Sequence, residues 1–348
     1  MRSSSTTTDA GEAVDRALFG FLAERGATLP DAIPLLLEIE RVVRAGGKRL
    51  RPAFCVWGFR SGGGRDVERI ARAAASLELL HTFAIIHDDV MDRSPMRRGE
   101  PATYRTLATI DGIRADPGRF GESAAILVGD LAMALADELW WSSGFQTPVV
   151  ADAARLYHAM RAEVIGGQFL DLLASARRSA TPEETRHISV LKSGRYTVER
   201  PLQIGAALAG AAGEVRAALS AFGAPLGEAF QLRDDVIGAF GDPSVTGKDA
   251  DGDLREGKQT LLVALARANA TDAQRALLDD RLGADDFGAD DALALRAVFR
   301  DTGALAQVQE LIGGLLGEAR AALRRGTLPS EAAEALDALA TEATLRDL

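Results

Sequence analysis

The stretch His81–Gly99, HTFAIIHDDVMDRSPMRRG, decides how the rest of the chain is interpreted. It runs from an apolar segment into three aspartates, Asp88, Asp89 and Asp92, and then into an arginine pair. On a helix Asp88 and Asp92 share a face, where like charges repel. They also lie near the expected end of the helix, where the macrodipole disfavours anions. A hard divalent cation would relieve this repulsion, whereas a solvated acidic helix end is the alternative interpretation.

Helical periodicity extends from this stretch towards the N-terminus and predicts one long helix over residues 67–92. The helix should end near Ser94-Pro95, because the residue before proline avoids the α region. Thr181 and Thr271 each precede a capping-box pattern, which predicts two further helix starts. No β-alternation persists along the chain. Further helices are expected over residues 123–140, 147–175 and 223–240.

Composition favours a helical globular protein, since 47% of the 348 residues are hydrophobic and only 5% are aromatic. A net charge of −10 without a basic stripe argues against a nucleic-acid partner. Cys55 is the only cysteine, so no intrachain disulfide can form. The chain shows no signal-peptide pattern and no transmembrane segment, and a cytoplasmic location is expected. Residues 1–12 are predicted to be disordered, and residues 13–348 to form a single all-α domain.

A second acidic stretch, QLRDDVIGAFGDPSVTGK, occupies Gln231–Lys248. It places Asp234 and Asp235 on a helix and is followed by Asp253 and Lys258. Acids that hold a metal, and lysines that neutralise the remaining charge, are what a metal-bridged phosphate site requires. A solvated polar loop is the alternative. We expect the two acidic stretches to face each other and to hold divalent metal.

Three weaker motifs accompany the acidic stretches. The segment 46–52, GGKRLRP, is a candidate anion site or a basic surface turn, and Arg97-Arg98 is a similar signal. In residues 166–171, GGQFLD, the helical glycines cost up to ~1 kcal/mol each relative to alanine, so close packing or a ligand should explain them. His81 alone would be interpreted as an ordinary core histidine.

The order of these motifs along one helical chain strongly resembles the trans-isoprenyl diphosphate synthases. The matching pieces, over roughly residues 15–348, are GGKRLRP, HDDVMD with RRG, GGQFLD, KSG, QLRDD and GDPSVTGK. The resemblance implies a single-domain helical bundle around a deep central cavity and a homodimer. It also implies a prenyltransferase that joins isopentenyl diphosphate head-to-tail to an allylic diphosphate (dimethylallyl, geranyl or farnesyl).

Site roles carry over from the resemblance position by position. The implied ligands of a cluster of three Mg²⁺ ions, with Mn²⁺ as a substitute, are Asp88, Asp89, Asp92, Asp171, Asp234, Asp235 and, through water, Asp253. Cations on the allylic diphosphate would be Arg97, Lys192, Lys248 and Lys258, while Gln231 would face the allylic chain near the reaction centre and Gln168 would line the cavity. The isopentenyl diphosphate site would comprise Lys48, Arg51, His81 and Arg98.

Two positions depart from the family pattern. The second acidic motif usually has a third acid where this chain has Gly238, and KSG has Ser193 where many members have threonine. Ser193 keeps a hydroxyl group. The metal site tolerates Gly238 if the third acid acts mainly through water, and tighter Mg²⁺ dependence or slower turnover is the alternative.

Phe83, five residues before Asp88, and the small Ala84 resemble the pattern of geranylgeranyl-forming members. Phe83 would close the product pocket, unless it is an ordinary core residue. Farnesyl or longer products are the alternatives.

Three rival classes remain: a class I terpene cyclase, a non-catalytic regulatory subunit of a heteromeric synthase, and a plain helical scaffold. The retained lysines and the GGKRLRP segment oppose them.

Overall fold

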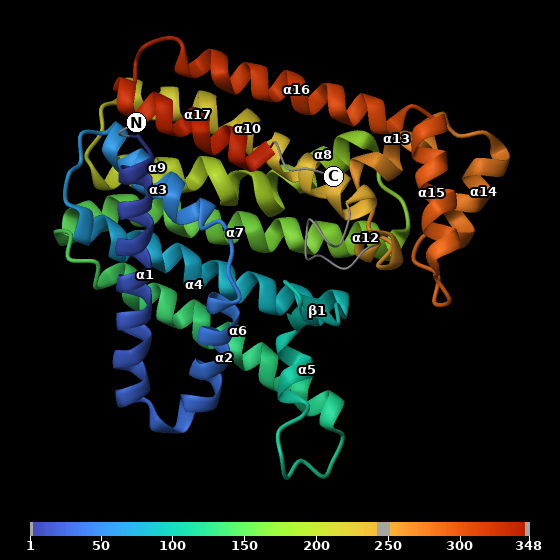
Figure 1. Cartoon of the computed structure of the whole chain (residues 1–348), viewed down its shortest axis with the longest axis horizontal. Coiled ribbons are helices and arrows are strands. Elements are labelled where there is room, and N and C mark those ends of the chain that lie inside the picture. The colour runs from blue at the N-terminus through green and yellow to red at the C-terminus, as the bar shows by residue number, and fades with distance from the viewer. Residues whose placement is uncertain (1–2, 242–250, 345–348) are drawn as a thin grey trace. The chain divides into compact units, whose positions relative to one another are not determined.

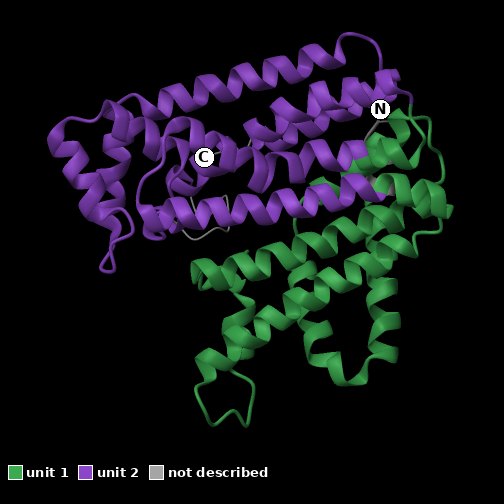
Figure 2. Ribbon diagram, turned by 180° about the vertical axis from the view of Figure 1, so that it is seen from behind, with its two compact units in different colours: residues 1–153, 204–211 green, residues 154–203, 212–348 purple. Residues whose placement is uncertain are grey.

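The computed structural model describes residues 3–241 and 251–344, with side chains from residue 11 onwards, and consists almost wholly of helices (Figure 1). Two compact units make up the chain (Figure 2). Unit 1 comprises Met1–Ala153 and Ile204–Ala211, and unit 2 comprises Ala154–Gln203 and Ala212–Leu348. Helices α7 (Thr147–Arg177) and α9 (Arg200–Leu208) each contribute residues to both units.

Unit 1 is organised around its longest buried helix, α4, which packs against α1, α3 and α6. Alanine, leucine and isoleucine line most of α4, so neighbours can contact it on several sides. The elements of unit 1 are α1 (Ser3–Thr28), η1 (Pro30–Ala32), α2 (Ile33–Arg44), α3 (Leu50–Ser61), α4 (Val67–Asp92), β1 (Met96–Arg97), β2 (Glu100–Pro101), α5 (Thr103–Leu107) and α6 (Pro117–Trp141).

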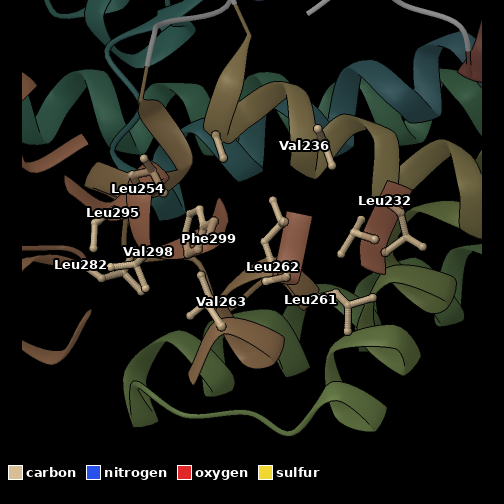
Figure 3. Packing of buried hydrophobic residues seen from close by; sticks show 14 of the residues in the cluster. Leu232, Val236, Leu254, Leu261, Leu262, Val263, Leu282, Leu295, Val298 and Phe299 are labelled. Atoms are coloured by element: carbon tan, nitrogen blue, oxygen red, sulfur yellow. The ribbon is translucent and has the colours of Figure 1, made fainter. Parts of the chain in front are cut away.

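Unit 2 is organised around α10 (Gly213–Phe240), which packs against α16 (Ala304–Leu323) and the π-helix η2 (Val190–Glu199). A buried cluster joins α10 to α12, α13 and α15, as Figure 3 shows around Val236, Leu254 and Phe299. The remaining helices are α8 (Pro182–Ser189), α12 (Gly252–Arg255), α13 (Leu261–Asn269), α14 (Asp272–Arg281), α15 (Ala289–Asp301) and α17 (Ser330–Thr344).

Helix α4 confirms the predicted helix in its full length. Asp66 caps its start by accepting a hydrogen bond from the Arg69 backbone N–H at 3.1 Å. The helix ends at Asp92 because Arg93 adopts a left-handed conformation with φ +54°. Both predicted capping boxes are present as well, at Thr181 and at Thr271.

Other elements differ from the sequence-based expectation. Helix α1 includes residues from Ser3 onwards, within the segment predicted to be disordered, although serine and threonine give little helix signal. Helices α6 and α10 begin earlier than expected, and α10 accommodates Pro225 in its interior. The short hairpin of β1 and β2 was not foreseen, because its strands have two residues each.

Over residues 3–241 and 251–344, no helix combines the length and apolar character that a membrane span requires.

Candidate functional site

The first acidic motif lies at the end of α4 in unit 1. Asp89 is 2% exposed, and Asp88 and Asp92 are partly buried. The Nε atom of Arg97 donates to Asp89 Oδ1 at 2.8 Å, and its Nη2 contacts both Asp89 and, at 3.5 Å, Asp88. Arg97 therefore offsets part of the negative charge of these two carboxylates.

A tight turn places Arg97 next to the end of α4. Arg98 and Gly99 both have positive φ, +55° and +79°, as the two central residues of a type I′ turn require. Strands β1 and β2 pair on either side of the turn, with Arg97 opposite Glu100. A non-glycine residue with left-handed backbone is uncommon, and here it lies beside acidic ligand candidates.

Basic side chains surround His81, which lies about two turns before the first aspartates. Burial, followed by the charges of Arg51, Arg98, Arg97 and Arg49, lowers the pKa of His81 well below its usual range. The imidazole is therefore neutral at pH 7 and can donate one hydrogen bond without adding charge. A neutral donor among guanidinium groups suits a diphosphate ligand.

Gly47 permits one of these contacts. A Cβ atom at this position would lie 2.8 Å from Nη2 of Arg98, and Gly47 has φ +139°. Burial is the main cause that lowers the pKa of Arg98, with neighbouring arginines adding to it and Glu78 opposing it. The structure thus brings the GGKRLRP segment and the RRG segment together within unit 1. Lys48 is exposed at the same segment.

Arg49 is a site residue that the sequence analysis did not single out. It precedes α3 with a left-handed backbone, and its Nη1 donates to Glu78 at 2.5 Å. The same guanidinium donates to the Val43 carbonyl at 2.9 Å and to Asp15 at 3.2 Å. Arg49 therefore joins three helices beneath the basic cluster. The sequence signal for Arg49 as a site residue was its place inside KRLRP. The sequence does not show which arginine of that run contacts the neighbouring helices.

The second acidic motif lies on α10 in unit 2, with Asp235 only 8% exposed. Burial, followed by the charge of Asp253, raises the pKa of Asp235 to about 8, and Asp234 and Asp171 contribute in the same direction. Gln231 opposes this shift by donating to Asp235 Oδ1 at 2.7 Å. Four predicted ligands are thus electrostatically coupled, and a divalent cation would stabilise their charged forms.

Two lysines each pair with one of these acids. Lys192 Nζ lies 2.6 Å from Asp171 Oδ2, and Lys258 Nζ lies 3.1 Å from Asp253 Oδ1. Lys258 also approaches Glu256 at 2.9 Å. Acids and lysines therefore alternate in this part of unit 2. Lys248 lies outside the described residues.

Lys192 belongs to the π-helix η2, a rare conformation that is frequent at functional sites. Gly167 of α7 lets this π-helix approach, because a Cβ atom there would lie 2.4 Å from the Lys192 backbone nitrogen. Gly166, its neighbour, has open space around it. Close packing therefore explains the second glycine of GGQFLD and not the first. Gln168 follows on the same helix and is partly buried.

Phe83 and Ala84 lie on α4, about a turn before the aspartates. Phe83 is 8% exposed, and its ring packs edge-to-face on His87 with centroids 4.8 Å apart. His87 Nε2 in turn lies 2.9 Å from the Ile126 carbonyl oxygen on α6. Gly129 makes room for this imidazole, since a Cβ atom there would lie 2.3 Å from it. Phe83 is thus held towards α6.

The acidic groups fit a metal that binds together with a ligand. Within the part of the chain that the structure describes, no three acidic, histidine or cysteine side chains enclose an ion by themselves. Mg²⁺ commonly takes one or two carboxylates and completes its shell with phosphate oxygens and water. The buried Asp235 beside Asp253 and the paired Asp88 and Asp89 supply such carboxylates.

Comparisons with known proteins show which family the chain resembles. The family model described as polyprenyl synthetase matches residues 34–298, which include parts of both units. Geranylfarnesyl diphosphate synthase of Aeropyrum pernix is 35% identical over 270 residues, covering 76% of this chain and 79% of that protein. Geranylgeranyl diphosphate synthase of Methanosarcina mazei is 33% identical, covering 70% and 73%. A crystal structure of geranylgeranyl pyrophosphate synthase from Corynebacterium glutamicum, complexed with isoprenyl diphosphate and magnesium, superposes with a TM-score of 0.93 at 34% identity, covering 97% and 99%.

Proposed function

The chain belongs to the polyprenyl synthetase family and is a prenyltransferase, and we propose that it joins isopentenyl diphosphate to an allylic diphosphate to give geranylgeranyl diphosphate. The observation that carries the proposal is the buried Asp235, whose pKa is raised to about 8 by its burial first and then by the charges of Asp253, Asp234 and Asp171. Such a group needs a cation to be charged at pH 7. Lysines beside the neighbouring acids suit the diphosphate that accompanies the cation.

Different residues would bind the two substrates. Mg²⁺, when bound, would supply positive charge that makes the allylic diphosphate a better leaving group. In unit 1, Asp88 and Asp89 would offer carboxylates to a metal ion, and in unit 2 Asp235 would do so. Lys192 and Lys258, also in unit 2, would bind phosphate oxygens. We propose three ions, with Mn²⁺ as a substitute, which metal analysis of the pyrophosphate complex would count. The basic cluster around His81 binds isopentenyl diphosphate.

The reaction then needs position and charge more than a side-chain base. The allylic C–O bond breaks, leaving an allylic cation and pyrophosphate. The double bond of isopentenyl diphosphate attacks the cation and forms the new C–C bond. A proton leaves the former isopentenyl unit, restoring a double bond, and passes to pyrophosphate. The protein contributes orientation, charge stabilisation and exclusion of water.

Product analysis tests this function directly. The purified protein should convert isopentenyl diphosphate and each allylic primer, in the presence of Mg²⁺, into an all-trans diphosphate, which hydrolysis and chromatography would size. Geranylgeraniol as the main alcohol is the expected result. Farnesol or a longer alcohol would correct the product length alone. A cyclised hydrocarbon would indicate a cyclase, and no product would indicate a regulatory subunit.

Phe83→Ala should lengthen the product, because removing the ring opens space below the first acidic motif. The product profile measures this change, and the size of the longest alcohol reports the depth gained. Phe54→Ala provides the matched control, since Phe54 is fully buried in α3 and its loss should lower stability without changing product length. An unchanged profile in Phe83→Ala would show that Phe83 is an ordinary core residue.

Helix α6 supports a homodimer. It exposes several large apolar side chains, with Leu127 56% exposed and Ile126 44% exposed. Neighbouring exposed apolar residues on one helix are typical of a protein–protein interface. Sedimentation should show a particle of twice the chain mass, and Leu127→Glu should shift it towards the monomer.

A further inference from the structure

Gly238 is the position where the second acidic motif lacks its expected third acid, and the structure shows what occupies the space. A Cβ atom on Gly238 would lie 1.9 Å from Oδ2 of Asp253 and 2.6 Å from its Cγ. Non-bonded carbon and oxygen atoms do not approach so closely. The Asp253 carboxylate therefore lies directly over the backbone of α10, where any side chain at residue 238 would begin.

This place is adjacent to the other acids of the motif. Residues 235 and 238 are three apart on α10, and residues 234 and 238 are four apart, so all three share one face of the helix. Among the charged neighbours of Asp235, Asp253 has the largest effect on it. Asp253 thus brings a carboxylate from α12 to the part of the helix face where the motif would otherwise carry its own.

Several contacts fix Asp253 in this position. Its Oδ1 accepts from Lys258 Nζ at 3.1 Å, and its carbonyl oxygen accepts from the Lys258 backbone N–H at 3.0 Å. The next residue, Leu254, is buried in the core cluster of unit 2. The backbone of α12 therefore has little freedom to move away from α10.

Arg296 of α15 ties the two elements together. Its Nε donates to the carbonyl oxygen of Ala239, the residue after Gly238, at 2.5 Å. Its Nη2 pairs with Asp251, which precedes α12. One guanidinium group thus holds the end of α10 and the start of α12 at a fixed separation.

We propose that Gly238 is a positioning residue whose missing side chain admits Asp253 as the third carboxylate of the second acidic motif. The glycine is then a requirement of this site and not a loss. This inference rests on the proposed function, because it concerns the metal-binding edge of the same site. Its consequence is counter-intuitive: restoring the family's usual acid at residue 238 should damage metal binding.

Calorimetric titration of Mg²⁺ in the presence of inorganic pyrophosphate tests this without turnover. Gly238→Asp should weaken Mg²⁺ binding about 10-fold or more, because Asp253 and Lys258 must move. Asp253→Asn, which keeps the shape and removes the charge, should weaken it by a similar factor. The exchange variant Gly238→Asp/Asp253→Gly should recover most of the loss, since the acid then comes from α10.

Gly317→Asp provides the matched control, because Gly317 lies on α16 with open space around it, and it should bind Mg²⁺ like the unmodified protein. Circular dichroism of every variant checks that the helices form. Unchanged or tighter Mg²⁺ binding in Gly238→Asp, or in Asp253→Asn, would overturn the inference. An exchange variant that binds Mg²⁺ no more tightly than Gly238→Asp would also overturn it. Failure of the unmodified protein to bind Mg²⁺ with pyrophosphate would instead overturn the proposed function.

Discussion

Asp235→Asn should reduce turnover by about 10³-fold and, at the same time, stabilise the metal-free protein at pH 8. Both effects come from the same carboxylate. In catalysis its charge helps to hold the metal on the leaving diphosphate. In the metal-free protein that charge is buried beside Asp253, Asp234 and Asp171, which raises its pKa to about 8.

The pH dependence of stability follows from this raised pKa. Between about pH 4 and pH 8, the folded protein binds a proton at Asp235 that the unfolded chain releases. The free energy of unfolding therefore falls as pH rises through this window, at up to about 1.4 kcal/mol per pH unit from this group. Below pH 4 both states are protonated, and the contribution is constant. Asparagine cannot ionise, so Asp235→Asn should flatten the curve.

Urea unfolding in EDTA, repeated from pH 5 to pH 8.5, measures the free energy of unfolding of both proteins as a function of pH. By pH 8 nearly the whole decrease in the free energy of unfolding that Asp235 causes should have occurred. Asp285→Asn is a suitable control, because Asp285 is exposed in the loop between α14 and α15, and it should change neither turnover nor the pH slope. Addition of Mg²⁺ with pyrophosphate should remove most of the slope in the unmodified protein. An Asp235→Asn protein with the unmodified slope would contradict the electrostatic account.

The second large effect on stability and turnover is expected from substitutions at the neighbouring glycines Gly166 and Gly167. Gly167→Ala should lower stability by about 1–3 kcal/mol, because its Cβ atom would overlap the backbone of Lys192 in η2. Displacement of η2 would also draw Lys192 away from Asp171, now 2.6 Å distant. Since small displacements of a positioned charge are costly, turnover should fall about 100-fold.

Gly166→Ala is the matched control within the same helix. Nothing lies within 4 Å of its Cβ position, and alanine favours the helix by up to about 1 kcal/mol relative to glycine. This variant should therefore be as stable as the unmodified protein or more so, with turnover retained. Thermal unfolding and steady-state rates distinguish the two variants. Equal effects of the two substitutions would contradict the packing of η2 on α7.

Local patterns predicted much of the helical framework. The periodicity of residues 67–92 is a property of one contiguous segment, so α4 was predicted from end to end, whereas its Asp66 cap was seen only in the structure. The capping boxes at Thr181 and Thr271 are equally local. The π-helix and the β1–β2 hairpin were missed, because the first depends on packing against Gly167 and the second is too short for a periodic signal.

By itself, the sequence determined the helical framework, because residue type and spacing carry that information. It also contained two acidic motifs and a basic segment whose order resembles that of the trans-isoprenyl diphosphate synthases. Only the tertiary structure decided how these residues act on one another. It shows His81 kept neutral among arginines, Arg97 paired with Asp89, and Asp253 in the space that Gly238 leaves. These properties depend on burial and on contacts between residues distant in the chain, which no local pattern encodes. For that reason the apparent defect of the second motif became intelligible only in three dimensions.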